Sequence, residues 1–256
     1  MFSSEERADY FKKIIEKLKS CNLVEGVVQL GSGVNGYNDE FSDIDLMVST
    51  YKTENVEAAK QAVLIVLEEF NPVYIKEKQF NKNIYLFIAF MENSLEFNIS
   101  ILPSELLNVK SPLWKVVVDK TGVVSQKMHT ENEIFQNHPD KYGVTSDIAF
   151  EFVYCALNMD KELRRNNFIY ALKMLENMRA YLLLAQAKNE NKKLHQFKSY
   201  DTLDPSFIST YLSTYPDEIA TEKLIAASSR LKGIFMEIIE QSPFITIDQK
   251  LFKMLK

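Results

Sequence analysis

The sequence predicts an α/β (α+β) N-terminal domain with a mixed sheet, followed by an all-α helical bundle domain. Short β-branched runs lie between amphipathic helices up to about residue 124, whereas from about residue 131 apolar residues recur mainly at helical spacing. A chain of 256 residues with 46% hydrophobic residues is long enough for two globular domains. We therefore expect one domain at residues 1–128 and a helical domain at residues 129–256.

The N-terminal half alternates helices and strands. Ser3 and Glu6 have the spacing of a capping box before a helix over residues 4–20. A buried strand over residues 24–30 precedes a loop at 32–42, where glycine, asparagine, serine and acidic residues dominate. The next predicted elements are a strand at 42–50, a helix at 54–70, strands at 73–78, 84–90, 95–102 and 116–118, and a turn at 91–94.

The C-terminal half carries helical patterns, with apolar residues three and four positions apart. They cover residues 149–157, 168–187, 205–215 and 221–239. No internal repeat or low-complexity linker separates them from the first half. This regular pattern predicts the helical bundle.

Charge and composition exclude several classes of protein. The net charge of -5 provides no basic surface for the phosphates of a long nucleic acid, so we expect no nucleic-acid partner. Cys21 and Cys155 are too few and too far apart for a disulfide framework, which indicates a reducing compartment. The polar N-terminus is unlike a signal peptide, and no apolar run reaches membrane-spanning length. We expect a cytoplasmic protein that does not bind membranes.

Three of the seven glycines, Gly31, Gly33 and Gly36, fall within six residues. They match the G-x-G-x-x-G dinucleotide fingerprint, but that motif requires a helix to begin inside it. Here the next strand starts by about Ser42, which leaves no room for the helix. No Gly-Lys-Ser/Thr follows, so a Walker loop is excluded as well.

Two carboxylates, Asp43 and Asp45, follow this glycine cluster on the predicted strand. Alternation places both on one face, with Cα atoms roughly 6.5–7 Å apart. Two like charges on a buried strand are costly unless a cation lies between them. The alternatives are a solvated strand edge for the carboxylates and a simple turn for the glycines.

The run from Leu30 to Ser32, together with the run from Phe41 to Val48, resembles the signature of the nucleotidyltransferase superfamily, which includes polymerase-β-like enzymes. It is similar in particular to bacterial aminoglycoside and lincosamide adenylyltransferases. The resemblance implies that Asp43 and Asp45 bind Mg²⁺. It extends more weakly over the helical half, which is similar to the helical domain of streptomycin-type adenylyltransferases.

The resemblance also implies a nucleotide site. In that family the Gly-Ser pair holds the nucleoside triphosphate, here ATP, and glycines allow close approach of phosphates. The residues assigned to the nucleotide are Gly31, Ser32, Gly33, Ser42 as a second hydroxyl, and Lys198 from the helical domain, with Lys173 and Arg179 as further candidates.

The two-metal chemistry of such enzymes usually includes a third carboxylate on a neighbouring strand. Comparison of the apolar pattern with the adenylyltransferases places Asn98 at that position, and an amide cannot act as a base. Glu96 lies two residues earlier on the same face. Either Glu96 serves as the third metal ligand and catalytic base, or the site binds nucleotide and has lost turnover.

These observations lead to one expectation and two rivals. The expected activity is Mg²⁺-dependent transfer of AMP from ATP to a hydroxyl of a small molecule, such as an aminoglycoside- or lincosamide-like antibiotic, with release of pyrophosphate. The rivals are a catalytically silent nucleotide-binding module and an adenylyltransferase that acts on a protein partner. The acceptor's identity and the oligomeric state, monomer or homodimer, stay open.

Overall fold

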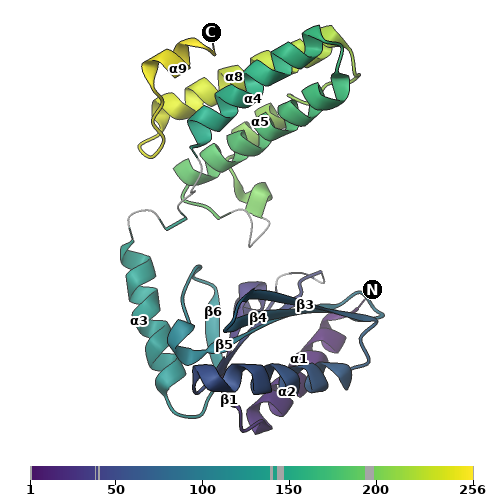
Figure 1. Cartoon of the computed structure of the whole chain (residues 1–256), viewed down its shortest axis with the longest axis vertical. Helices are drawn as coiled ribbons and strands as arrows, with labels where there is room; N and C mark the ends of the chain where they lie inside the picture. Colours follow the sequence, from purple (N-terminus) through teal and green to yellow (C-terminus); the bar gives the residue numbers. More distant parts are fainter. Residues whose placement is uncertain are drawn as a thin grey trace. The chain divides into compact units, whose positions relative to one another are not determined.

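The computed structural model describes residues 2–37, 39, 41–138, 141–142, 147–193 and 199–255. The chain forms two compact units, Met1–Pro139, here called the N-unit, and Asp140–Lys256, the C-unit. Figure 1 colours the N-unit from purple to teal and the C-unit from green to yellow. The position expected for the domain boundary, 128/129, lies within helix α3, Val123–Asn137, which belongs to the N-unit.

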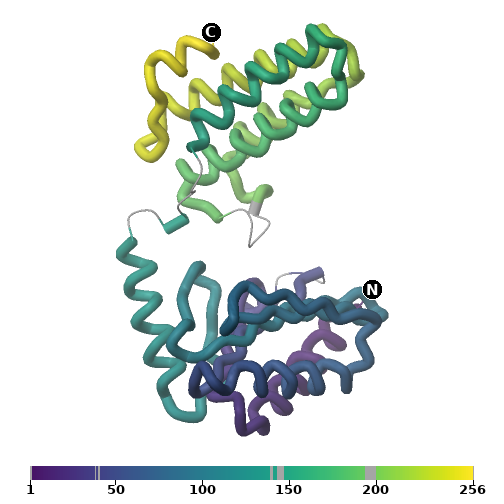
Figure 2. The backbone as a smooth tube through the Cα atoms, viewed as in Figure 1, coloured from purple at the N-terminus to yellow at the C-terminus, as the bar shows by residue number. Residues whose placement is uncertain are grey.

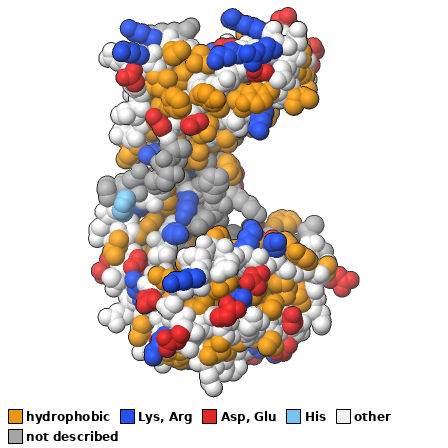
Figure 3. Space-filling model, viewed as in Figure 1, with side chains coloured by type: hydrophobic (Ala, Val, Ile, Leu, Met, Phe, Trp, Pro, Cys, Tyr) orange, Lys and Arg blue, Asp and Glu red, His pale blue; other side chains and the backbone are white. Residues whose placement is uncertain are grey.

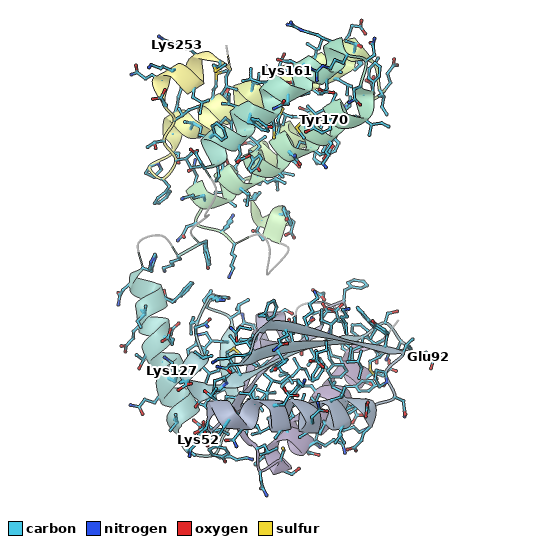
Figure 4. The ribbon with its side chains drawn as sticks, viewed as in Figure 1. Lys52, Glu92, Lys127, Lys161, Tyr170 and Lys253 are labelled. Atoms are coloured by element: carbon cyan, nitrogen blue, oxygen red, sulfur yellow. The ribbon has the colours of Figure 1, made fainter. Side chains whose placement is uncertain are left out.

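The N-unit is built on a six-stranded mixed sheet with the order β3-β4-β5-β2-β1-β6. Its strands are β1 Val24–Leu30, β2 Ile44–Thr50, β3 Tyr74–Asn81, β4 Ile84–Phe90, β5 Glu96–Pro103 and β6 Trp114–Asp119. β2 and β5 pair in parallel, and the other neighbouring strands pair antiparallel. All six strands predicted from the sequence are confirmed, and Figure 4 places Glu92 at the tip of the predicted β4–β5 hairpin.

Two helices cover one face of this sheet, α1 Ser4–Ser20 and α2 Val56–Glu68 (Figure 1). The predicted capping box is confirmed: the Glu6 N–H donates to Ser3 Oγ at 3.1 Å and the Ser3 N–H donates to Glu6 Oε2 at 2.7 Å. The face beneath the helices carries every second residue of the central strands, including Ile44, Leu46 and Val48 of β2, in one buried core. The polar residues of β2 and β5 therefore point to the other face.

Helix α3 packs beside β6 and was not anticipated from the sequence (Figure 2). It approaches β1 closely at Gly26, where a Cβ atom would lie 2.7 Å from both the Val118 carbonyl oxygen and Val124 Cγ2. Only a residue without a side chain fits there. The turn before α3 is closed by Asp119, which accepts hydrogen bonds from the Gly122 and Ser125 amides.

The C-unit is all-helical in its described part. Its helices are α4 Ile148–Arg164, α5 Phe168–Asn189, α7 Pro205–Leu212, α8 Thr221–Gln241 and α9 Gln249–Lys253. The four helices predicted from the sequence are confirmed, and α9 was not anticipated. α4, α5 and α8 pack around one apolar core, in which the rings of Phe152 and Phe235 stack 3.8 Å apart. The mixed-sheet domain and the helical bundle predicted from the sequence are both present.

The surface of the N-unit mixes charges of both signs with apolar side chains on the face that Figure 3 shows. Among the helices that the structure describes, none combines the length and the apolar character needed to cross a membrane.

Candidate active site

The connection between β1 and β2 carries most of the residues that the sequence singles out. It begins with a 3₁₀ turn, η1 Gly31–Asn35, rather than with the irregular loop expected. Gly31, Gly36 and Tyr37 have positive φ angles of 70°, 90° and 59°. No α-helix starts in this segment, and β2 follows at Ile44, so the dinucleotide fold is excluded by the structure as well.

Gly31 lies directly against the carboxylate of Asp45. A Cβ atom on Gly31 would be 2.9 Å from Asp45 Oδ2, which is closer than such atoms approach. The antiparallel pairing of Leu30 with Asp45 brings the two residues together at the end of β1. Glycine is thus required twice here, for its positive φ and for the space that the carboxylate occupies.

The backbone amide of Gly31, one of the groups assigned to phosphate, donates to the carbonyl of Leu113 at 3.2 Å. The Ser32 carbonyl accepts from the amides of Gly36 and Tyr37 and so closes the turn. These contacts shape the connection around Asp45. Binding of a phosphate by the Gly31 amide would require that bond to Leu113 to open.

Gly33 is covered by two side chains. A Cβ atom at this position would lie 2.4 Å from Gln29 Nε2 and 2.8 Å from the Tyr37 hydroxyl. Ser42 donates its hydroxyl to Asp39 Oδ1 at 2.8 Å. Both residues are assigned to the nucleotide, but in this structure Gly33 is covered by Gln29 and Tyr37, and the Ser42 hydroxyl is hydrogen-bonded to Asp39.

Asp45 is half-buried on the sheet face that α1 and α2 leave uncovered, and its parallel neighbour on β5 is Asn98. Asp43 is half-buried and precedes the first residue of β2, Ile44. Glu96 is also half-buried and begins β5, one residue before the Ile44 partner Phe97. The register therefore sets Glu96 at the level of Asp43, and Asn98 at the level of Asp45.

The three predicted carboxylates do not converge on a ready-made three-ligand centre. Within the described ranges, no three His, Cys, Asp or Glu side chains lie close enough together to hold one metal ion. Asp43 and Asp45 remain the two candidate metal ligands that the sequence predicts. Lys198, the basic residue assigned to the triphosphate, lies outside the described residues.

Arg179, a further candidate for the triphosphate, has its guanidinium engaged inside the C-unit. It is buried, donates from Nη2 to the Thr214 carbonyl at 2.7 Å, and pairs with Glu176 through Nη1 at 2.5 Å. Its guanidinium carbon lies 4.0 Å from the centre of the Tyr215 ring. The side chain holds the segment between α7 and α8 to α5, which is a structural role.

Sequence reasoning missed Arg7, which contacts the connection from α1. It is 2% exposed and donates from Nη1 to the Ser42 carbonyl at 3.1 Å and from Nη2 to the Asp39 carbonyl at 2.9 Å. A signal existed in the sequence: Arg7 precedes Ile14 by seven residues and therefore occupies the buried stripe of the helix. A charged residue on that stripe indicates a partner that the helix alone does not provide.

Tyr37 links this arginine to the carboxylates. The Arg7 guanidinium lies 3.9 Å from the centre of the Tyr37 ring. Burial raises the pKa of the Tyr37 hydroxyl, and the carboxylates of Asp45 and Asp43 raise it further, whereas the Gln29 amide and Arg7 act in the opposite direction. The tyrosine is therefore neutral at physiological pH and lies within electrostatic reach of both aspartates.

Asp39 is exposed and supports the same connection. Hydrogen bonds from the Ser42 hydroxyl and the Phe41 amide lower the pKa of the Asp39 carboxyl, with a smaller contribution from the charge of Arg7. One carboxylate oxygen of Asp39 therefore accepts the hydrogen bonds that close the turn before Asp43.

Comparison with solved structures finds several similar chains. One is an aminoglycoside 6-adenyltransferase from Bacillus subtilis, with 14% identity over 93% of this chain and 89% of that chain, at a TM-score of 0.35. Another is a nucleotidyltransferase-like protein from Exiguobacterium sibiricum, with 10% identity over 90% and 75% of the two chains and a TM-score of 0.44. Terminal uridylyl transferase 4 from Trypanosoma brucei has 10% identity over 92% and 69%, at 0.34.

No curated protein matches the chain. The family comparison carries the assignment, because the streptomycin adenylyltransferase family matches residues 4–241 and so spans nearly the whole chain. That range includes the glycine connection, both aspartates and the helical unit up to the end of α8. The chain therefore belongs to the streptomycin adenylyltransferase family and is a nucleotidyltransferase enzyme.

Proposed function

We propose that this enzyme transfers AMP from ATP to a hydroxyl group of an aminoglycoside- or lincosamide-like antibiotic and releases pyrophosphate. Membership of the family supports nucleotidyl transfer, and the family's description names streptomycin, an aminoglycoside. The observation that carries the proposal is the contact between Asp45 and Gly31, where a glycine with positive φ leaves room for a carboxylate at the junction of β1 and β2.

The residues present suit Mg²⁺ as the metal ion. Mg²⁺ takes oxygen ligands and is usually bound through one or two carboxylates, with water and substrate phosphates completing its shell. Asp43 and Asp45 provide two carboxylates that are two residues apart in sequence and both act electrostatically on Tyr37, so a third protein ligand is not required. When bound, the metal ion would neutralise charge on the triphosphate and on the departing pyrophosphate.

The protein's own residues would perform the remaining steps. Asp43 and Asp45 would hold the metal ion with its triphosphate, and Ser32 would contact the phosphates. Glu96 takes the proton of the acceptor hydroxyl as its oxygen forms a bond to the α-phosphorus. The bond between that phosphorus and the pyrophosphate oxygen breaks, so the products are the adenylylated acceptor and pyrophosphate.

The two units are proposed to divide the work. The N-unit carries the candidate carboxylates and would perform the transfer, and the helical C-unit would bind the acceptor. This proposal rests on the placement of Asp43, Asp45 and Glu96 in the N-unit and on the family match, which includes both units.

The test is pyrophosphate release from each of the four nucleoside triphosphates with Mg²⁺ and a panel of aminoglycosides and lincosamides. We expect turnover with ATP and at least one acceptor, and a loss of about 100-fold or more in Asp45→Asn. Asp9→Asn is the matched control, because Asp9 is an exposed carboxylate on α1 paired with Lys13. Equal rates in Asp45→Asn and the wild type would contradict the proposal.

One observation favours a second candidate, a module that binds nucleotide without turnover: the neighbour of Asp45 on β5 is the amide Asn98. It predicts ATP binding by calorimetry with no pyrophosphate from any acceptor in the panel. Turnover by the wild type with any member of the panel excludes this candidate.

A further inference from the structure

Arg7 contacts the β1–β2 connection at three separate points. Its two terminal nitrogens donate to the carbonyls of Asp39 and Ser42, and its guanidinium carbon lies over the Tyr37 ring, 3.9 Å from the ring centre. Ser42 immediately precedes Asp43. One buried side chain of α1 thus holds the segment that leads into the candidate metal ligands.

Tyr37 connects Arg7 to the beginning of the connection, at Gly33. Its hydroxyl and ring lie over Gly33, close to the Gln29 amide at the end of β1. The stack of Arg7 on Tyr37 therefore joins the glycine turn to the strand that follows it. The neighbouring Gly31 packs against Asp45, so both ends of the connection are tied to the position of that carboxylate.

The burial of Arg7 is costly for the fold. Within the described residues, its Nε finds no hydrogen-bond acceptor although it is buried. A buried cation with an unsatisfied donor destabilises the folded state relative to a well-packed apolar side chain. Its two carbonyl acceptors and its nearer aromatic ring, Tyr37, belong to the connection, whereas the centre of a second ring, Phe2, lies 5.7 Å from the guanidinium carbon. The hydrogen bonds and the closest ring contact of the arginine are therefore made with the connection.

We propose that Arg7 is a positioning residue that holds the connection so that Asp43 and Asp45 are preorganised for a divalent cation. This inference rests on the proposed function of those carboxylates. The guanidinium does this by its planar, two-point donation and its stack on Tyr37, a geometry that lysine cannot reproduce. Supporting residues of this kind usually change metal affinity when they are replaced.

The experiment measures Mn²⁺ binding to the purified full chain by calorimetry, without nucleotide. Arg7→Lys, Arg7→Met and Tyr37→Leu are each expected to bind Mn²⁺ about tenfold more weakly than the wild type. Where turnover is measurable, KM for the metal–ATP complex rises and KM for the acceptor stays unchanged. Tyr37→Leu changes no residue of α1, so its Mn²⁺ affinity tests the inference even if Arg7→Met fails to fold.

Arg179→Met is a matched control, because Arg179 is equally buried, donates to a carbonyl and stacks on Tyr215 at 4.0 Å, but in the C-unit. It is expected to lower the melting temperature without changing Mn²⁺ affinity. Wild-type Mn²⁺ affinity in folded Arg7→Lys and Tyr37→Leu would overturn the inference. If Asp45→Asn also bound Mn²⁺ like the wild type, the proposed function itself would fail, so the two failures are distinguishable.

Discussion

Asp45 of β2 and Asn98 of β5 lie side by side in the parallel pairing of the two strands, on the sheet face that helices α1 and α2 leave uncovered. A carboxylate therefore has an amide as its cross-strand neighbour. The nearest acidic side chain on the same face of β5 is Glu96, two residues or about 6.6 Å along the strand. Glu96, the proposed base, is therefore level with Asp43 in the strand register and not with Asp45.

The first prediction concerns this base. Glu96→Gln keeps the size of the side chain but cannot accept the proton of the acceptor hydroxyl, so kcat should fall by about 100-fold or more. ATP affinity, measured by calorimetry, should change little. Glu92→Gln is the control, because Glu92 is exposed at the hairpin tip labelled in Figure 4. Unchanged kcat in Glu96→Gln would remove Glu96 from the mechanism.

The second prediction separates the two requirements for glycine at the turn. Gly31→Ala and Gly36→Ala both place a side chain at positive φ, which costs about 1–2 kcal/mol. Only at Gly31 does the new Cβ meet Asp45, whereas nothing lies within 4 Å of a Cβ at Gly36. Both variants should lose stability in urea titrations, but only Gly31→Ala should also lose Mn²⁺ affinity. Equal Mn²⁺ affinities would show that the contact with Asp45 has no role in metal binding.

The third prediction concerns pH. Burial opposes ionisation of Asp119, but hydrogen bonds from Ser125 and the turn amides outweigh it and lower the pKa of the carboxyl below its ordinary value of 3.8. A lowered pKa in the folded state stabilises the protein above pH 3.8, and this contribution disappears as the pH falls through the folded-state pKa.

Asp119→Asn should therefore destabilise the N-unit by about 1 kcal/mol at pH 7, because a charged acceptor at the start of α3 is lost. The difference from the wild type should shrink as the pH falls below 3.8, where the wild-type carboxyl also becomes protonated. Thermal unfolding at pH 7 and at acid pH measures both effects. A destabilisation that is independent of pH would contradict the role of the charge.

The fourth prediction tests the arginine of the C-unit. Arg179→Met removes the donors to the Thr214 hydroxyl and carbonyl and leaves both acceptors in a buried position. The free energy of unfolding should fall by about 2 kcal/mol or more. Arg230→Met, which removes an exposed donor to the Ser213 carbonyl, should cost much less. Similar losses in the two variants would argue against the buried network as the cause.

Local patterns were sufficient for most of the secondary structure. The capping box at Ser3 and Glu6 and the turn after Met91 appear in the structure as predicted. The strand β2 also forms, but its exposed edge is limited to Asp45, because the residues from Leu46 to Thr50 are all buried. These features depend on residues within a few positions of one another, so the sequence carries them directly. Helix α3 was missed because its apolar residues are few and its first turn is capped by Asp119 of the preceding strand.

The sequence by itself determined the two-part architecture and the candidate pair Asp43 and Asp45, since periodicity, composition and the family resemblance are all local or cumulative signals. Only the tertiary structure decided what surrounds that pair. It fixed the register that pairs Asp45 with Asn98, the residue that the sequence comparison places on the neighbouring strand, and it brought Arg7 of α1 against the connection. The physical reason is that strand register and helix docking join residues far apart in the chain, and no spacing rule within one segment encodes those contacts.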